Sequence, residues 1–440
     1  MRVLMFGWEF PPYQAGGLAT ATLGLVKGLL RQGLDVTLVV PFPAPAAGST
    51  PIPELRLLSA ADVPLRVRTH RIESPLAPYA TAEDYVLLAE RAAPAPGAHA
   101  AGSPYGRNLF EEIERYADAA AEIARREPHD VIDTHDWITF AAGIRAREVS
   151  GKPLVAHIHA TELDRVGEHG NPEIVRRELA GLRAADRVIA NSNTLRHQVI
   201  ERYGVPADKV DVVHWGVDAS AAPAEEPPEL PLFDGRPTVL FLGRVTRQKG
   251  PEYFVEIAAR VRRFVPGVRF LMVGAGDLLP RCIERAVELG LADCMHFAGP
   301  LSGAEVDRAY RAADVCVMPS VSEPFGLVAL ESLRNGTPVI VPRSSGVAEV
   351  VRHAFKADFW DVERMADQVV ALLRHPELWA ELADGARDEI AEPRFGLEEP
   401  ARRTALSYRR TLADATAVAP AVAPAAPAAA PAPIARMETA

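Results

Sequence analysis

Short apolar runs alternate with longer amphipathic segments along most of the chain, and this alternation predicts a repeated strand–helix pattern. The first unit has a buried strand at residues 2–6, a helix at 18–31 that ends at Gly33, and a second strand at 35–40. Strands that are apolar throughout are typical of parallel sheets with helices on both faces. Further strands and helices are expected at 108–126, 131–135, 154–159, 187–190 and 210–213.

Residues 219–234 interrupt this pattern because they are rich in proline, alanine and glutamate, a composition typical of a linker between domains. A second strand–helix series follows, with a strand at 238–243 and a helix at 251–263. Two doubly wound α/β domains in series place a cleft between the carboxyl ends of their sheets. We therefore expect Rossmann-like domains at 1–218 and 235–398 that face each other across this cleft.

The end of the chain differs in composition from both domains. Residues 399–412 have the pattern of a terminal helix, which could pack back on the first domain. Alanine and proline dominate residues 413–440, and few side chains there are able to form a core. We expect these residues to form a disordered tail.

Composition narrows the classes of function. The chain has 440 residues, 48% of them hydrophobic, which is ample for two cores. Its net charge of −10 argues against binding to nucleic acid or to an anionic membrane. Its three cysteines, Cys282, Cys294 and Cys316, lack a metal-binding spacing and are typical of a reducing compartment. No signal peptide or membrane-spanning run is evident, so we expect a cytoplasmic protein.

The candidate chemistry is concentrated where a loop leads from a buried strand at 315–319 into a helix of about three turns, which Gly336 is expected to end. Gly326 stands at the expected helix start, which offers unpaired N–H groups and a positive dipole to a phosphate. Glu323 and Glu331 flank this point, and carboxylates accept hydrogen bonds from sugar hydroxyls. Taken alone, the same spacing is more often an amphipathic helix with a capping acid.

A second loop, 243–250, follows a strand and precedes a helix. Arg244 and Lys249 in this loop suit a diphosphate, because arginine offers a fork of donors and lysine a point charge. An ordinary solvated loop is the alternative interpretation.

Three places in the first domain are further candidates. Gly16 and Gly17 begin the first helix at the sheet edge where ligands bind, although a flexible turn is equally compatible, and the G-x-G-x-x-G pattern of a dinucleotide site is missing. Asp136 lies between His135 and Trp137, where it could simply cap a helix. His159 ends a strand and shares a face with His157, but a third metal ligand is not apparent from the sequence.

Together these stretches resemble the retaining GT-B glycosyltransferases of family 4. Glu323 and Glu331, with Pro-Phe-Gly-Leu after the first, are similar to the E-x7-E motif of that family, and residues 243–250 are similar to its G-R-x-x-x-Q-K-G diphosphate clamp. The resemblance implies that Arg244 and Lys249 stabilise the leaving nucleoside diphosphate. It also implies the remaining substrate contacts. The amides of Gly326 and Leu327 would contact the diphosphate with Phe325 beside them, and Glu331 would contact the ribose. Glu323 and His159 would contact the donor sugar, and Asp136 would lie near the acceptor.

Two features are also similar to glycogen and starch synthases, namely Gly16-Gly17-Leu18 and Gln248-Lys249-Gly250. The chain departs from the synthases and from family 4 at four positions: Gln14 for lysine, Phe325 for cysteine, Glu331 for tyrosine, and Trp215 for an asparagine usual in family 4. The resemblance therefore implies a family 4 enzyme with a synthase-like first half.

The function implied is transfer of a hexose, with retention of configuration, from a nucleotide sugar such as ADP-glucose or UDP-glucose to a glycan or glycoside, for example an α-glucan. Neither a cofactor nor a metal ion is expected. Two alternatives stay open: a nucleotide-sugar 2-epimerase of the same fold, and a non-catalytic partner subunit with a relic site. The complete set of Arg244, Lys249, Glu323 and Glu331 speaks against a relic.

Overall fold

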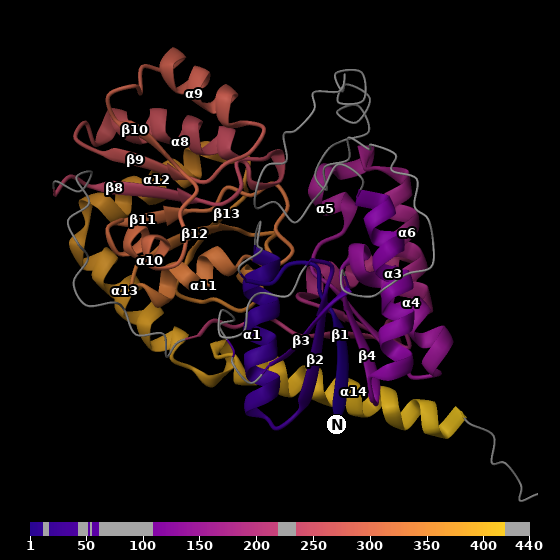
Figure 1. Cartoon of the computed structure of the whole chain (residues 1–440). Helices are drawn as coiled ribbons and strands as arrows, with labels where there is room; N and C mark the ends of the chain where they lie inside the picture. The colour runs from indigo at the N-terminus through magenta and orange to yellow at the C-terminus, as the bar shows by residue number, and fades with distance from the viewer. Residues whose placement is uncertain (12–16, 43–51, 53–54, 61–108, 219–234, 419–440) are drawn as a thin grey trace, which may run out of the picture.

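The computed structural model describes residues 1–11, 17–42, 52, 55–60, 109–218 and 235–418. These residues form two α/β domains with a parallel sheet in each (Figure 1). Gly16, the expected linker at 219–234 and the part of the expected tail from 419 onwards lie outside the described residues. The doubly wound architecture predicted from the strand–helix pattern is therefore confirmed.

The first domain contains a seven-stranded parallel sheet in the order β3-β2-β1-β4-β5-β6-β7. Its strands are β1 (Arg2–Phe6), β2 (Asp35–Val40), β3 (Arg56–Ser59), β4 (Val131–His135), β5 (Leu154–Ile158), β6 (Arg187–Ala190) and β7 (Val210–Val212). Its helices are α1 (Gly17–Arg31), α3 (Leu109–Arg126), α4 (Trp137–Ser150), α5 (Glu162–Val166), α6 (Pro172–Ala184) and α7 (Asn193–Tyr203), with short 3-10 turns η2 (Gly167–His169) and η3 (Ala207–Lys209).

The second domain contains a six-stranded parallel sheet in the order β10-β9-β8-β11-β12-β13. Its strands are β8 (Thr238–Leu242), β9 (Arg269–Val273), β10 (Met295–Gly299), β11 (Val315–Val317), β12 (Val339–Pro342) and β13 (Phe355–Ala357). Its helices are α8 (Pro251–Phe264), α9 (Leu279–Glu288), α10 (Ala304–Arg311), α11 (Leu327–Arg334), α12 (Val362–Arg374) and α13 (Pro376–Ile390), with 3-10 turns η4 (Arg247–Lys249), η5 (Gly346–Glu349) and η6 (Pro393–Phe395).

Apolar side chains cover both faces of each sheet. In the first domain one core contains Ile113 of α3 and Phe140 of α4, and the other contains Val26 of α1. In the second domain Phe254 of α8 lies in one core and Leu330 of α11 in the other. This burial on both faces explains why the strands are continuous apolar runs rather than alternating ones.

The last helix, α14 (Glu398–Val418), returns from the second domain and packs beside α1 of the first (Figure 1). Tyr408 is fully buried there among the side chains of the first sheet. The helix continues six residues past the end expected at residue 412, because the added alanines favour helix and Asp414 pairs with Arg187 at 2.9 Å. The expected start of the tail at residue 413 is therefore wrong.

The helix expected after Glu323 is present as α11, and Gly326 precedes it with φ 116°. Its eight residues span about 12 Å, which is shorter than the three turns expected. Gly336, with φ 78°, follows the helix as the terminating glycine expected from the sequence. Within the described ranges, no helix combines the length and hydrophobicity needed to cross a membrane.

Candidate active site

A cavity of about 790 Å³ lies between the two domains and is lined by residues from both. In the first sheet the strand order reverses between β1 and β4, and in the second it reverses between β8 and β11. Loops after these four strands diverge to opposite faces, which opens a crevice at each carboxyl edge. Ten residues expected from the sequence line the cavity: Gly17, Asp136, His159, Arg244, Lys249, Glu323, Phe325, Gly326, Leu327 and Glu331.

The cation and carboxylate loops of the second domain meet directly. Lys249 Nζ donates to Glu323 Oε2 at 2.7 Å, and Ser320 Oγ donates to the same oxygen at 3.0 Å. Gly250 allows this approach, because its φ is 64° and an added Cβ would lie 2.1 Å from the carbonyl oxygen of Pro319. The pair places a positive and a negative group side by side at the cavity wall. Ser320, the other donor to Glu323, was not singled out by the sequence analysis.

Glu331 is held from the neighbouring helix α10. Tyr310 Oη donates to Glu331 Oε2 at 3.0 Å, and burial raises the pKa of this carboxyl group. The tyrosine fixes the orientation of the carboxylate toward the cavity that both Glu331 and Gly326 line. No sequence motif marked Tyr310, because it lies 21 residues away on a helix of its own.

Arg244 and Phe325 complete the wall of the second domain in different ways. Arg244 Nη2 donates to Gln248 Oε1 at 3.0 Å, and both residues line the cavity. Phe325 is only 1% exposed and packs edge-to-face on Trp215, with ring centroids 5.6 Å apart. Trp215 also contacts the ring of His159, so these aromatic side chains connect the two walls.

Asp136 has the least favourable backbone of the wall formed by the first domain. Its φ of 61° is the only positive value at a non-glycine residue in the part of the chain that the structure describes, and with ψ 168° it lies in a region adopted almost only by glycine. Its side chain accepts from the His159 amide at 2.7 Å and from Arg165 at 3.3 Å. Strain of this kind is concentrated at functional sites, because surrounding contacts must maintain it.

A buried charge network lies behind Asp136 and was not anticipated. Arg165 donates to Glu178 at 3.1 Å and lies 3.9 Å from Glu162, so one guanidinium serves these two carboxylates and Asp136. Burial raises the pKa of Glu178 to about 8, and Tyr203 donates a hydrogen bond to it. The backbone N–H of Glu162 also donates to Glu178, at 2.7 Å, so this buried carboxyl group accepts hydrogen bonds at both of its oxygens.

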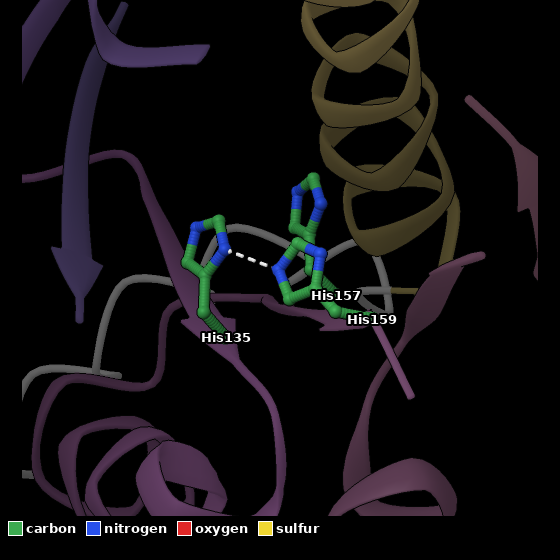
Figure 2. Close-up of side chains that lie close together, drawn as sticks. All are labelled: His135, His157 and His159. Carbon is green, nitrogen blue, oxygen red and sulfur yellow. Dashed lines mark hydrogen bonds between the residues drawn. The ribbon is translucent and has the colours of Figure 1, made fainter. Parts of the chain in front are cut away.

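Three histidines gather at the carboxyl ends of β4 and β5 (Figure 2). His135 and His157 are register partners, and His159 is two residues farther along the same strand face. The third imidazole that sequence analysis did not find is therefore His135. The pairing of neighbouring strands supplies it, and two polar residues at matching strand ends are the signal that could have found it.

These histidines are the described residues that could hold a metal ion, since their ligand atoms lie within 4.8 Å of one another. His135 Nδ1 and His159 Nε2 are 2.8 Å apart in rings inclined by only 9°. Two nitrogens on one tetrahedral zinc ion would be about 3.4 Å apart. The observed arrangement is that of an N–H···N hydrogen bond, and the expectation that no metal is needed stays a prediction.

Known proteins resemble the chain over both domains. The family described as glycosyl transferases group 1 matches residues 224–389, and glycosyltransferase family 4 matches residues 85–221. A D-inositol 3-phosphate glycosyltransferase of Acidothermus cellulolyticus is 36% identical in an alignment 324 positions long, which covers 66% of this chain and 71% of that protein.

Solved structures share the fold at lower sequence identity. A sucrose-phosphate synthase of Thermosynechococcus elongatus has a TM-score of 0.72 and 22% identity, covering 94% of this chain and 99% of its own. HepE of Anabaena, in complex with UDP-glucose, has a TM-score of 0.66 and 18% identity, covering 93% of this chain and all of its own. The fold is therefore the GT-B arrangement, and the chain belongs to the group 1 and family 4 glycosyltransferases.

Proposed function

We propose that the protein transfers a hexose, with retention of configuration, from a nucleotide sugar to a hydroxyl group of a glycan or glycoside. Glucose carried by UDP or ADP is the donor we propose, and an α-glucan is one acceptor of this class. The observation that carries the proposal is the assembly of Arg244, Lys249, Glu323 and Glu331 in one interdomain cavity. A solved structure of similar fold, HepE, is a complex with UDP-glucose, which supports this donor class.

The second domain would hold the nucleotide. Glu331, oriented by Tyr310, can accept hydrogen bonds from the two ribose hydroxyls. Arg244, Lys249 and the amides at the start of α11 can surround the diphosphate, where negative charge grows as the bond to the sugar breaks. Because these groups are cationic or positively polarised, they stabilise the leaving group without a metal ion.

The ion pair between Lys249 and Glu323 implies that both side chains change partners when a donor binds. Lys249 is bound to Glu323 at 2.7 Å, so a diphosphate must share or take over this ammonium group. Glu323 then becomes available to the hydroxyl groups of the donor sugar, to which a carboxylate can accept hydrogen bonds. Donor binding would in this way prepare both groups together.

The wall formed by the first domain favours an uncharged acceptor. Its charged groups in the described residues are Glu9, Asp136 and Arg165, and Arg165 is already paired with carboxylates. Among the described residues that line this wall, a phosphorylated acceptor would find no cation other than Arg165, which is already paired with Asp136 at 3.3 Å, and this disfavours it electrostatically. We therefore propose a polyhydroxylated acceptor without phosphate, unlike the substrate named for the D-inositol 3-phosphate glycosyltransferase.

A panel of nucleotide sugars tests the function. Release of nucleoside diphosphate that requires an acceptor identifies a transferase, and NMR of the product anomeric proton decides retention. A new nucleotide sugar without acceptor would indicate the epimerase, and no reaction would indicate a partner subunit; the matched families favour neither. Acceptors offered with and without phosphate, such as glucose and glucose 6-phosphate, separate the two acceptor classes.

A further inference from the structure

One carboxylate that the proposed catalysis does not use joins the two domains. Glu349 ends the 3-10 turn η5 of the second domain, and its side chain reaches helix α7 of the first. We propose that Glu349 is a positioning residue, which holds the second domain against α7 and thereby keeps loop 323–326 opposite the wall formed by the first domain. The role of that loop in donor binding rests on the proposed function, whereas the contact between the domains does not.

The hydrogen bonds that converge on Glu349 come from the first turn of α7. Its Oε2 accepts from the backbone N–H of Asn193 at 2.9 Å and from the amide group of the same side chain at 3.0 Å. Its Oε1 accepts from the backbone N–H of Thr194 at 2.8 Å and from the Thr194 hydroxyl group at 3.0 Å. Both carboxylate oxygens are therefore bound by the other domain, at the positive end of a helix dipole.

Glu349 completes the capping of α7. The first N–H groups of a helix have no partner within the helix itself. The side chain of Ser192, the N-cap, accepts from the N–H of Leu195, and Glu349 supplies acceptors for the two N–H groups before it. Burial raises the pKa of Glu349, but hydrogen bonds from His214 and from the start of α7 outweigh burial and lower the pKa to about 2. The contact is therefore one between a carboxylate and a helix start.

The turn that carries this carboxylate is bound to loop 323–326 through its backbone. The N–H of Gly346 donates to the carbonyl oxygen of Glu323 at 3.0 Å, and the N–H of Val347 donates to that of Phe325 at 2.7 Å. Gly346 allows the approach, because an added Cβ would lie 2.0 Å from another carbonyl oxygen of the loop. A displacement of η5 would therefore move the loop with it.

On the other side, η5 packs against residues that lead to His159. An added Cβ at Gly346 would also lie 2.6 Å from Cβ of Ser192. The residue before Ser192 is Asn191, whose side chain donates to the carbonyl oxygen of His159 at 2.9 Å. His159 lines the interdomain cavity. A short path of direct contacts thus joins loop 323–326 of the second domain to His159 of the first.

A second polar contact between the domains lies next to the same loop. Ser322 Oγ donates at 2.9 Å to Oδ1 of Asp164 on α5, and the other oxygen of Asp164 is bound within the first domain. This contact consists of one hydrogen bond, whereas Glu349 accepts four from α7 among the described residues. Hydrogen bonds to an ionised group are the stronger kind, and Glu349 has the larger number of them. Glu349 should therefore dominate the attachment.

Asp361 offers a matched control within a single domain. Its Oδ1 accepts from the backbone N–H of Arg364 at 3.0 Å, in the first turn of α12. The carboxylate and the helix both belong to the second domain, so its loss removes a helix cap without affecting α7. A comparison of Glu349→Ala with Asp361→Ala separates the capping of a helix from the contact between domains.

Double electron–electron resonance on the full chain tests the contact without a substrate. Nitroxide labels on Ala180→Cys of α6 and Glu284→Cys of α9 report the separation of the domains, since both positions are exposed and the three native cysteines are buried. Glu349→Ala should move part of the distance distribution to longer values, whereas Asp361→Ala should leave it unchanged. Identical distributions for Glu349→Ala and its labelled parent would overturn the inference.

A variant on the other domain keeps the test independent of the folding of Glu349→Ala. Thr194→Val removes one hydroxyl donor to the same carboxylate from the exposed start of α7. It should shift the distribution in the same direction by a smaller amount, and it should add no shift in a chain that already carries Glu349→Ala, because the two side chains act through one contact. An equal shift in both backgrounds, or none in the parent, would contradict the inference.

Binding and turnover connect the contact to the proposed function. The nucleotide contacts proposed for Arg244, Lys249 and Glu331 all belong to the second domain, so the Kd of UDP and of ADP by calorimetry should stay within about twofold in Glu349→Ala. Turnover also needs His159 of the first domain in place, so kcat should fall roughly tenfold or more. A longer distance with unchanged kcat would overturn the positioning role. A chain that transfers no sugar would refute the proposed function, and the distance measurement would still decide the role of Glu349.

Discussion

Replacement of Lys249 by methionine tests the central assignment, because it removes the ammonium group but keeps an unbranched side chain of similar length. Lys249 Nζ lies 2.7 Å from Glu323 Oε2 at the cavity wall. Charge on the diphosphate grows as the sugar–oxygen bond breaks, so a cation there matters more in the transition state than in the ground state. We therefore expect the main effect in kcat rather than in the donor KM.

The size of the effect follows from the geometry. Loss of one donor that stabilises developing charge lowers kcat by roughly a hundredfold, or about 2.7 kcal/mol. The substitution also removes one of the two side-chain donors that bind Glu323 Oε2, whose side chain is 8% exposed, and leaves Ser320 Oγ at 3.0 Å as the other. An underpaired buried carboxylate costs about 1–3 kcal/mol of stability. Adding Glu323→Gln to the variant should restore stability but not turnover.

Steady-state kinetics with varied donor at saturating acceptor, together with thermal unfolding, separates these effects. Lys356→Met is the matched control, since Lys356 is a partly buried lysine of the same domain that donates to the carbonyl oxygen of Ala348 outside the cavity. A kcat of Lys249→Met within about threefold of the wild type would refute the role in the transition state. An increase in donor KM with unchanged kcat would instead show uniform binding.

Four further predictions follow from the same structure. Glu331→Ala should raise the donor KM with a much smaller loss of kcat, because ribose hydroxyls carry no developing charge. The stability of Glu178→Gln relative to the wild type should increase as pH rises from about 4.5 to 8. Burial raises the pKa of Glu178 to about 8, so in this window the folded wild type binds a proton that the unfolded chain has lost, and wild-type stability falls with rising pH. Removal of residues 419–440 should leave melting temperature and turnover unchanged, whereas truncation after Leu412 should lower the melting temperature, because α14 continues to Val418. Turnover should persist in chelator, since the proposed charge at the diphosphate comes from side chains and amides.

Each of these predictions has a contrary result. Normal kinetics of Glu331→Ala would show that this carboxylate does not contact the donor. Parallel stability curves of Glu178→Gln and wild type against pH would mean that Glu178 is ionised when folded. Equal melting temperatures of both truncations would show that the end of α14 adds nothing, and activity that vanishes in chelator and returns with metal would bring the three histidines back as ligands.

Local sequence determined most of the secondary structure. Fully apolar strands such as β1 and β8 follow from burial on both faces, and Gly33 and Gly336 stop helices because only glycine adopts their positive φ readily. The loop after β11 and the loop after β8 could also be recognised, since each carries its chemistry within a few consecutive residues. Parallel strands end at a common edge, which is why these loops meet in one cavity.

Partners distant in the chain were decided only by tertiary structure. Tyr310 reaches Glu331 from another helix, His135 reaches His159 across a strand pair, and Tyr408 reaches Asp133 from the end of the chain. None of these contacts produces a periodicity or a motif, because each joins single residues on separate elements. The end of α14 is of the same kind, since residues past 412 are helical where Asp414 can pair with Arg187.

The strained Asp136 shows the same division within one residue. The sequence placed it after a strand, next to candidate histidines, but the combination of φ 61° with ψ 168° is one that residues other than glycine rarely adopt. That backbone persists because His159 and Arg165, fixed by β5 and α5, hold the carboxylate. Residue type and order therefore specify which groups a site contains, whereas their orientation and protonation depend on contacts that exist only after the sheets and helices have packed.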